Sequence, residues 1–500
     1  MKVSPRPVIV GVGQFVNRCH EPAQIKDPFE MIEMAVHCAE EDSGVASLAK
    51  KVDGLCLVNI LSASHPDPPR LIAERIGARP SELLYTWVGA SAPQWFVNRG
   101  AERIATGRWE IALICGGEAF HSRRLARAMG KDGWWAGEGF PKSPRMVGDM
   151  RDPLTSLEIR YGMVMPIHVY PLFENALRHQ ESLSLEEHRK EIGGFCSRLS
   201  RIAATNPYAW FRDAKGSDEI TSISPENRMV CFPYTKFMCS IMDVDQSAAL
   251  FMTDEETARG LGIPRHKWVY LRGCGDASDL WYVSQRIAFH SSPSVKVAAE
   301  KAMEMAGVSM EEIKYLDFYS CFPCAPRIAG NMLGISRDDP RPITVTGGMP
   351  YFGGPGNSYS LHAICRMVEI LRQEPQEVGM VQALSWFISK HSVGIYSGSS
   401  PEVPYKPVDP KTYQKELDLL KGPELVEEAS GKATLETYTV IHDRDGRPVS
   451  SIIIGRLEDG RRFLASGEDK EDVYREMMER EVIGEKGTVN CRQGVNVFIL

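Results

Sequence analysis

The chain has no long apolar run and no excess of basic residues. No stretch reaches the roughly 18 to 20 apolar residues that a membrane-spanning helix needs, and Met1 to Pro5 lead into a predicted strand without the apolar core of a signal peptide. The net charge is −7 at pH 7, whereas nucleic-acid binding needs clustered Lys and Arg. We therefore expect a cytoplasmic protein whose partner is a small molecule, with no nucleic acid and no membrane span.

Paired cysteines are also scarce. The 12 cysteines are spread singly through apolar contexts, apart from Cys321 and Cys324. A zinc site needs a second pair at suitable spacing, and the sequence has none. We therefore expect most cysteines to be small core residues in a reducing compartment, and we expect no metal site.

The chain is instead rich in alternating strand and helix patterns. Its 500 residues, 43% of them hydrophobic, are enough for about three domains with sizeable cores. Alternation through the first unit is typical of an open, largely parallel sheet covered on both faces. The pattern predicts strands at 8–15, 52–59, 84–88 and 110–115, and helices at 27–42, 69–76 and 93–106.

A second unit repeats this order. Gly273 and Gly275 follow the start of a predicted strand, as Gly11 and Gly13 do in the first unit. A single repeat at such long spacing indicates a duplicated core of two similar halves rather than a solenoid, whose periods are much shorter. The repeat predicts strands at 268–271, 314–319, 343–345 and 378–384, and helices at 294–306, 325–333 and from 360 onward.

A glycine-rich stretch from Thr344 to Arg372 joins a short strand to a helix. Backbone can approach a ligand closely where there is no Cβ, and the free N–H groups at a helix start favour anionic or carbonyl oxygen. A second stretch of small residues, Thr86 to Ser91, precedes the helix at 93–106. We interpret the glycine-rich stretch as a ligand cradle; the alternative is an ordinary tight turn in an α/β protein.

The remaining segments predict an insertion and an appended domain. The segment between the halves is too long for a structureless loop, so we expect it to have its own helices, at 169–178 and 186–204. After a proline-rich linker, strands separated by Asp-Gly turns begin at Thr437. The predicted units are 1–118 (first half), 119–240 (insertion), 241–400 (second half), 401–430 (linker) and 431–500 (small β-rich domain).

Several motifs in this order resemble the thiolase superfamily. Residues 116–118 (G-G-E) close the first half, 206–209 are similar to the N-P-x-A element of sterol-carrier-protein thiolases, and 244–249 are like the family's N-D-G-A-A-A. This resemblance covers about residues 5–400. It implies an α/β thiolase fold of two duplicated five-layered halves with an inserted loop domain. The segment after Thr437 is similar to the additional β-rich C-terminal domain of type 1 thiolase-like proteins.

The catalytic positions of the family can be placed, and all depart from its pattern. The nucleophilic cysteine falls on Gly89, the histidine of the G-H-P motif on Gly354, and the second cysteine near Ser385. A thiolase needs a thiolate to carry the acyl group, a histidine to deprotonate it and a second acid/base for the α-carbon. The resemblance implies a protein of the acetyl-CoA acetyltransferase superfamily and of lipid metabolism, but thiolytic or condensing activity is not expected.

Four residues are candidate catalytic groups. The family's H-[DE]-x-F element matches Tyr319 to Phe322, so a tyrosine replaces its histidine, and a phenol can donate a hydrogen bond to an oxyanion. Cys321 follows a strand near the expected site, His362 lies on the cradle helix, and His391 follows the last core strand. For each of them the alternative is a structural residue that packs or hydrogen-bonds in the core.

The resemblance implies coenzyme A or an acyl-CoA as ligand and no tightly bound cofactor. Coenzyme A needs a cation for phosphate, an apolar surface for adenine and a tunnel for pantetheine. We expect Lys236 and Ser240 to contact it, Gly353 and Gly354 to belong to its cradle, and Trp134 to stack on adenine. The alternative is a solvated face with core aromatic residues.

Three functions are compatible with these residues. The first is acyl-CoA or coenzyme A binding without thiolase chemistry. The second is a retro-aldolase that cleaves a β-hydroxyacyl-CoA, because that cleavage needs only a base and an oxyanion site. The third is a non-catalytic coenzyme A-binding module. A second tyrosine facing Tyr319 across the pocket would favour the lyase, and a pocket filled by side chains would favour the module.

For assembly we expect a monomer or a weak homodimer. Thiolase-fold proteins usually dimerise through the sheet edge of the first half. The appended domain is too small to be very stable alone, so we expect it to dock on the core and shield that edge.

Overall fold

Both halves of the chain contribute to one long sheet. The computed structural model describes residues 6–19, 21–130 and 144–500, and its described strands follow the order β10-β11-β12-β9-β1-β8-β4-β2-β3-β5. The halves meet where β1 pairs with β9. The bounds are β1 Pro7–Val16, β2 Gly54–Leu57, β3 Glu82–Thr86, β4 Ala112–Ala119, β5 Arg145–Val147, β8 Asp245–Asp254, β9 Val269–Ser278, β10 Ile313–Phe318, β11 Val378–Ser385 and β12 Lys390–Ser397.

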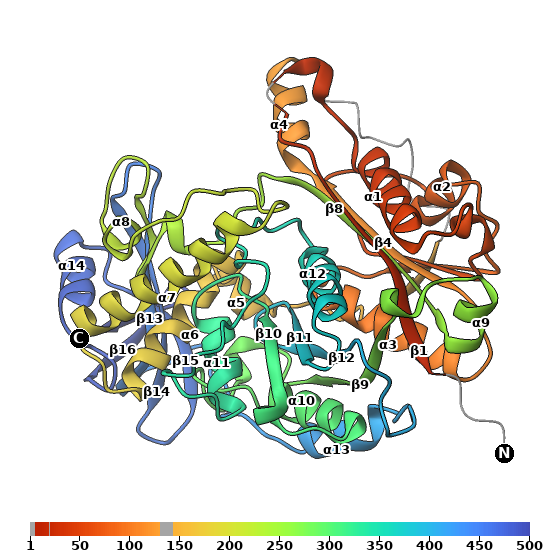
Figure 1. The fold of residues 1–500 in the computed structure, drawn as a ribbon. Helices are drawn as coiled ribbons and strands as arrows, with labels where there is room; N and C mark the ends of the chain where they lie inside the picture. Colours follow the sequence, from red (N-terminus) through yellow and green to blue (C-terminus); the bar gives the residue numbers. More distant parts are fainter. Residues whose placement is uncertain (1–5, 20, 131–143) are drawn as a thin grey trace.

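Helices cover the outer faces of the halves and fill the space between them. α1 and α2 cover the first half, α10, α11 and α13 cover the second, and α3 and α12 lie between the two, near the middle of Figure 1. Helices, sheet, helices, sheet and helices thus make the five-layered α/β arrangement that the resemblance to thiolases implies. The bounds are α1 Pro28–Ser43, α2 Pro68–Arg75, α3 Ala92–Ala105, α9 Glu255–Gly260, α10 Pro293–Ala306, α11 Cys324–Met332, α12 Tyr359–Gln373 and α13 Lys411–Asp418.

The repeated glycines explain how strand and helix approach so closely in each half. A Cβ added at Gly13 of β1 would overlap the backbone oxygen of Ala35 on α1. In the second half a Cβ at Gly275 of β9 would overlap the backbone oxygen of Ala298 on α10 in the same way. The repeat seen in the sequence is therefore a packing requirement that both halves share.

The strand predicted at 343–345 is absent from the described structure. Phe318 N of β10 donates a hydrogen bond to Ile343 O at 3.0 Å, as it would to a strand paired with the edge of β10. The Asp317 carboxylate then accepts the next amides, Val345 N at 2.9 Å and Thr346 N at 3.1 Å. Because this buried side chain takes the donors that a strand would use, the segment turns away from the sheet.

The boundary predicted at residue 241 falls too early. β8 lies between β1 and β4 and pairs antiparallel with both, so it completes the sheet of the first half. The second half therefore begins after β8. The sequence analysis also missed β12, which pairs antiparallel with β9 and β11.

The insertion covers the edge of the first half. β5 pairs in parallel with β3, with Arg145 opposite Leu84 and Val147 opposite Thr86. The prediction that the appended domain shields this edge is therefore wrong; a strand of the insertion does so. Its other described elements are α4 Phe120–Ala128, α5 Ser156–Arg160, α6 Pro166–Gln180, α7 Leu185–Thr205, α8 Ser217–Thr221, β6 Met229–Cys231 and β7 Tyr234–Thr235.

The carboxyl-terminal strands close into a small barrel. β13 pairs with both β14 and β16, while β15 pairs with β14 and, in parallel, with β17. This closed order, with helix α14 between the third and fourth strands, is that of an OB-fold barrel. The bounds are β13 Gly431–His442, β14 Pro448–Leu457, β15 Arg462–Gly467, α14 Glu471–Glu479, β16 Lys486–Arg492 and β17 Val495–Ile499. The sequence analysis did not predict β16.

The barrel docks on the insertion, at the opposite end of Figure 1 from the first half. β6 pairs with β13, and α6 packs on β13. Thr437 Oγ1 donates to Leu172 O at 2.6 Å, and Asn175 Nδ2 donates to Tyr438 O at 2.8 Å. The small domain thus gains through docking the burial that it lacks alone, as the sequence analysis expected.

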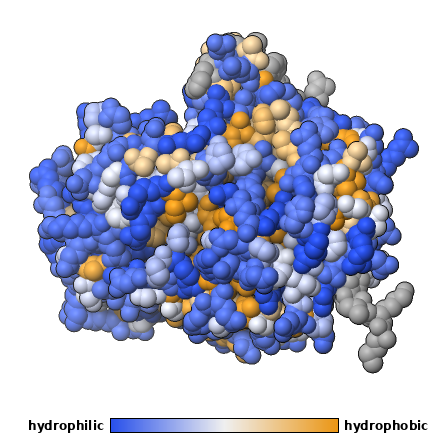
Figure 2. Space-filling model, in the orientation of Figure 1, coloured by the Kyte–Doolittle hydropathy of each residue, from blue (hydrophilic) through white to orange (hydrophobic). Residues whose placement is uncertain are grey.

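The surface in Figure 2 is mostly hydrophilic, and its hydrophobic residues gather in several separate areas. Within the part of the chain that the structure describes, no helix is long and apolar enough to cross a membrane.

Candidate functional site

Two of the three substituted thiolase positions lie side by side. Gly89 precedes α3 and Ser385 ends β11, and a Cβ added at Gly89 would lie 2.8 Å from Ser385 Oγ. Gly354, in the turn before α12, instead lies against Ser240 and Met349, and a Cβ there would be 3.0 Å from Met349 Cε. The fold therefore brings together the two former cysteine positions, while protein atoms fill the space at the former histidine position.

The backbone donors around this pair are already taken. Gly89 N donates to Asn357 Oδ1 at 3.0 Å, and Ser91 N donates to Ser385 Oγ at 2.8 Å. Ser385 Oγ in turn donates to Ser91 Oγ at 2.7 Å. An oxyanion hole needs free donors aimed at the reacting oxygen. These amides would have to break existing hydrogen bonds before they could bind a thioester oxygen.

The glycine cradle is filled by the insertion helix α7. A Cβ at Gly347 would lie 2.5 Å from the backbone of Ala203, and one at Gly348 would lie 3.0 Å from Leu199 Cδ1. Both glycines have positive φ, 111° and 76°. Their lack of a side chain therefore serves a turn that packs against protein.

The second half of the cradle is filled by buried polar side chains. A Cβ at Gly353 would overlap the Gln246 amide, and one at Gly356 would overlap the Glu118 carboxylate. Glu118 accepts hydrogen bonds from the amides of Leu61 and Ser62, and burial raises its pKa to about 7. Gly353 and Gly354 therefore contact protein in this structure, not an open ligand space.

Tyr319 lies after β10 and is 6% exposed. Its ring meets that of Tyr359 edge-on, with centroids 5.5 Å apart. Burial raises the pKa of Tyr319, and within the described residues its hydroxyl makes no hydrogen bond. The Tyr359 hydroxyl lies 2.6 Å from Thr346 Oγ1 and donates to Asp317 Oδ1 at 3.4 Å. A second tyrosine thus faces Tyr319 in direct ring contact.

Cys321 lies in the same buried cluster and is 7% exposed. Burial raises its pKa to about 12, so the thiol stays protonated at neutral pH. Cys324, its neighbour in the sequence, is also a free buried thiol. Their surroundings are those of core residues.

The two candidate histidines are buried in separate places. His362 Nδ1 lies 2.8 Å from Gln14 Oε1, and burial lowers the pKa of His362 to about 3. His391 lies between Ser292 Oγ, at 3.0 Å, and Gln382 Nε2, at 2.8 Å. Burial is the main cause that lowers its pKa to about 4. Both rings are neutral at pH 7. Gln382 links His391 to the backbone of Tyr319, because its Oε1 accepts a hydrogen bond from Tyr319 N at 3.1 Å.

Two of the three expected coenzyme A contact side chains lie in the described part of the chain. Lys236 is exposed on a short helical turn, and Ser240 Oγ is buried without a partner among the described residues. Trp134 lies outside the described residues. Ser240 lies against the glycine cradle, since a Cβ added at Gly354 would overlap its Oγ.

An open cavity of about 330 Å³ lies beside Gly89, and the sequence analysis did not anticipate its key residue. We call it the Lys390 cavity; Trp87, Trp95, Ser91, Asp149 and Lys390 are among its lining residues. β5 helps to build it, because the residues that follow its pairing with β3 supply one wall. The only signal in the sequence was a lysine five positions after the second former cysteine position.

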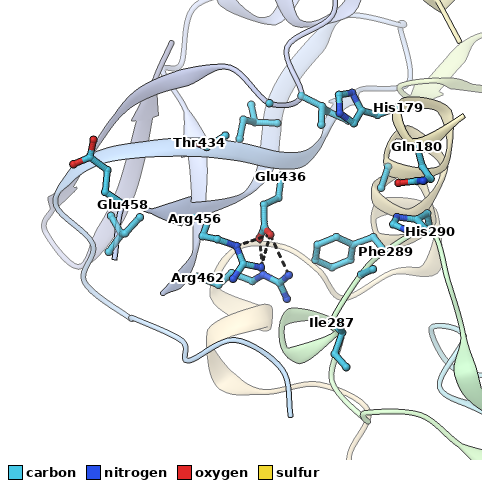
Figure 3. A pocket seen from close by; sticks show the side chains of 16 residues that line it. His179, Gln180, Ile287, Phe289, His290, Thr434, Glu436, Arg456, Glu458 and Arg462 are labelled. Atoms are coloured by element: carbon cyan, nitrogen blue, oxygen red, sulfur yellow. Dashed lines mark hydrogen bonds and ion pairs between the residues drawn. The ribbon is translucent and has the colours of Figure 1, made fainter. Parts of the chain in front are cut away.

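A second cavity, of about 590 Å³, lies at the seam between the barrel and the second half (Figure 3). Glu436 accepts hydrogen bonds from Arg456 and Arg462, each at 2.6 Å. The Arg462 guanidinium also lies 4.7 Å from the centroid of the Phe289 ring. All three charges belong to the barrel, and Arg462 also donates to the backbone oxygens of Ser284 and Arg286, so this arginine links the barrel to the second half.

Comparison with known proteins decides the family. Over its whole length the chain is similar to the crystal structure of a monomeric SCP2-thiolase-like protein type 1 from Mycobacterium smegmatis, with 32% identity, 100% coverage of both chains and a TM-score of 0.86. The chain belongs to the type 1 thiolase-like proteins. Residues 412–493 match the family model "Thiolase-like protein type 1 additional C-terminal domain". The predicted family and fold class are confirmed.

More distant relatives of this thiolase-like protein include enzymes. An acetyl-CoA acetyltransferase of Methanocaldococcus jannaschii is 24% identical over 270 residues, which are 53% of this chain and 60% of that enzyme, so the match spans less than two thirds of its length. An Ltp2-ChsH2(DUF35) aldolase structure is 17% identical, with a TM-score of 0.60 over 79% of this chain and 98% of that chain. An acetyl-CoA acetyltransferase from Syntrophomonas wolfei is also 17% identical, with a TM-score of 0.57 over 80% of this chain and 100% of that chain. The two structures share the fold.

Restoring the first cysteine of this thiolase-like protein, in Gly89→Cys, is expected not to give ready acylation by acetyl-CoA at neutral pH. A free thiol has a pKa near 8.5, and Gly354 supplies no base to lower it. The Gly89 amide is also occupied by Asn357. Intact-mass spectrometry measures the acylation, and Gly216→Cys is the control, because Gly216 is exposed with open space at its Cβ. Acylation of Gly89→Cys well above this control would contradict the expectation.

Proposed function

We propose that the protein binds acyl-CoA thioesters without thiolase chemistry. The observation that carries this proposal is the meeting of Gly89 and Ser385 beside an open cavity, where neither position offers a thiol. A small acyl group fits a cavity of this size. Without a thiolate, the site lacks the acyl carrier that thiolase chemistry uses. The distant similarity to an acetyl-CoA acetyltransferase supports the same ligand class.

In this proposal the nucleotide part of coenzyme A lies outside the core. Lys236 is exposed and is free to approach a phosphate, and Ser240 lies four residues further along the chain. Trp134 remains the proposed adenine contact. Gly353 and Gly354 are left out, because Gln246 and Ser240 occupy the space in front of them.

A retro-aldolase is the second candidate, and the contact between Tyr319 and Tyr359 favours it. Buried Asp317, whose pKa burial raises to about 6, lies behind Tyr359 and could exchange a proton through it. The aldolase among the solved structures shares the fold. Against this candidate, Tyr319 and Tyr359 belong to a packed hydrophobic cluster, which favours a non-catalytic module.

We also propose that the protein is a monomer. β5 occupies the edge of β3, so a second copy cannot add its own strand there without displacing it. The similar protein from Mycobacterium smegmatis is described as monomeric.

Calorimetric titration of the full chain with coenzyme A, acetyl-CoA and a 3-hydroxyacyl-CoA tests the proposal, on a sample whose mass is measured by light scattering. Binding without product formation is the expected result. Release of an aldehyde or ketone from the 3-hydroxyacyl-CoA would favour the lyase, and no binding at millimolar concentration would contradict both candidates. Lys236→Ala is expected to weaken binding. The control is Lys190→Ala, a lysine paired with Glu186 on α7, which should leave binding unchanged.

A further inference from the structure

Lys390 is a mostly buried amine without a partner. It begins β12 and lies opposite Ser385 in the antiparallel register with β11. A Cβ at Gly89 would lie 3.9 Å from its Nζ. Among the described residues, Nζ makes no hydrogen bond and no ion pair within 4.0 Å, although most lysines of a folded protein are solvated or paired. An unpaired, mostly buried amine at the edge of a cavity therefore needs an explanation.

The charged groups that face Lys390 are bound to other residues. Asp149, the carboxylate with the largest electrostatic effect on Lys390, is held by Arg151 through Nη2 at 2.6 Å and Nε at 3.0 Å. Asp276 is held by Arg99 at 2.9 Å. Burial lowers the pKa of Lys390, and the charge of Arg151 acts in the same direction, while the two carboxylates oppose both. More of the amine is therefore neutral at pH 7 than in an exposed lysine.

The cavity around this amine has aromatic walls and a hydroxyl group. Trp87 and Trp95 line it, and Trp87 is 37% exposed, so the cavity opens to solvent beside an apolar surface. Ser91 Oγ accepts the hydrogen bond from Ser385, which leaves the Ser91 proton free to be donated to a ligand oxygen. The volume of about 330 Å³ admits a small molecule.

We propose that Lys390 binds a small aldehyde or ketone covalently, as an imine, in the Lys390 cavity. The neutral amine adds to the carbonyl carbon, so that a C–N bond forms and the carbonyl π bond breaks. The carbonyl oxygen then leaves as water with the two protons that the amine nitrogen loses, and Ser91 relays a proton to that oxygen. No oxidant or reductant takes part, and the step does not depend on coenzyme A binding.

Reductive trapping tests this proposal. The full chain is incubated at pH 7 with propionaldehyde and sodium cyanoborohydride, and peptide mass spectrometry follows the labelling of each lysine over time. We expect Lys390 to be labelled at least about tenfold faster than Lys296, whose side chain is 51% exposed and lies 3.8 Å from Glu300. Lys390→Met should remove the fast phase, and Lys296→Met should leave it unchanged.

Equal labelling of Lys390 and Lys296 in the unaltered chain would overturn the proposal, whether or not Lys390→Met folds. A fast phase that survives in a folded Lys390→Met variant would do so as well. Stabilisation by propionate together with slow labelling of Lys390 would show that the amine binds a carboxylate as a charged group, and that result would also overturn the imine. Failure of coenzyme A binding in the calorimetric titration would leave this result unaffected.

Discussion

Glu174→Ala is expected to lower the free energy of unfolding by about 3 to 5 kcal/mol, the cost of breaking a buried ion pair. Glu174, on α6 of the insertion, is fully buried. It accepts hydrogen bonds from Arg327 Nη1 at 2.8 Å, His188 Nε2 at 2.9 Å and Tyr234 OH at 2.6 Å. Its loss would take from Arg327 of α11 its fully buried partner and leave it with the less buried Glu181 and Glu191. His188 and Tyr234 would lose their acceptor as well.

The effect should depend on pH. Burial alone would raise the pKa of Glu174, but the hydrogen bond from His188 and the charge of Arg327 outweigh burial, and the pKa lies below its ordinary value. A carboxyl group with a depressed pKa contributes stability above its unfolded pKa of about 4.3, and this contribution is lost as the pH falls through the folded value. The difference between the parent chain and Glu174→Ala should therefore be constant near neutral pH and shrink in acid.

Urea unfolding at several pH values measures this prediction. The matched control is Glu186→Ala, because Glu186 pairs with Lys190 at 2.7 Å on the exposed face of α7. An exposed pair of this kind contributes little, so the control should unfold as the parent chain does. A loss below about 1 kcal/mol in Glu174→Ala would contradict a stabilising role for the buried Glu174 carboxylate.

Arg462→Ala is expected to weaken the docking of the barrel, again by about 3 to 5 kcal/mol. Arg462 is fully buried in the seam shown in Figure 3. Its guanidinium donates to the backbone oxygens of Ser284 and Arg286, as well as to Glu436. Removing it would leave two buried carbonyl groups of the second half without this donor and Glu436 with Arg456 alone.

Arg456→Ala is the matched control for the seam. Arg456 binds the same carboxylate, but its side chain is 34% exposed, so its loss should cost about 1 kcal/mol or less. Thermal unfolding followed by circular dichroism gives the overall loss, and limited proteolysis of the segment 401–430 reports undocking. Equal effects in Arg462→Ala and Arg456→Ala would contradict a special role for the buried arginine.

Much of the core could be predicted from the sequence, because its signals are local. The start of α1 is one case: Asp27 Oδ1 accepts a hydrogen bond from Glu30 N at 2.7 Å, and Pro28 opens the helix, as the residue types predict. Gly13 and Gly275 are another case, because a glycine at the same place in two repeated strands indicates close packing on a helix. The strand predicted at 343–345 does not form, because the side chain of Asp317, which is distant in the sequence, accepts hydrogen bonds from the amides of Val345 and Thr346.

The candidate site could be predicted less well. Loss of the thiolase groups at Gly89, Gly354 and Ser385 is visible in the residue types alone, so the expected absence of that chemistry rests on the sequence. The filled cradle is not visible there, because nothing local tells which side chain occupies the space that a glycine leaves. Gln246 and Ala203 occupy that space from elements distant in the sequence.

The sequence by itself determined the family, the duplicated α/β core and the missing thiolase residues, because these depend on residue type and on periodic local patterns. Only the tertiary structure decided that β5 covers the edge of β3 and that Lys390, partly buried beside a cavity, makes no ion pair with the described residues. Burial and pairing depend on which distant segments surround a side chain. Desolvation then changes the chemistry of that side chain, and for this reason a lysine that looks ordinary in the sequence becomes the residue that we propose forms an imine.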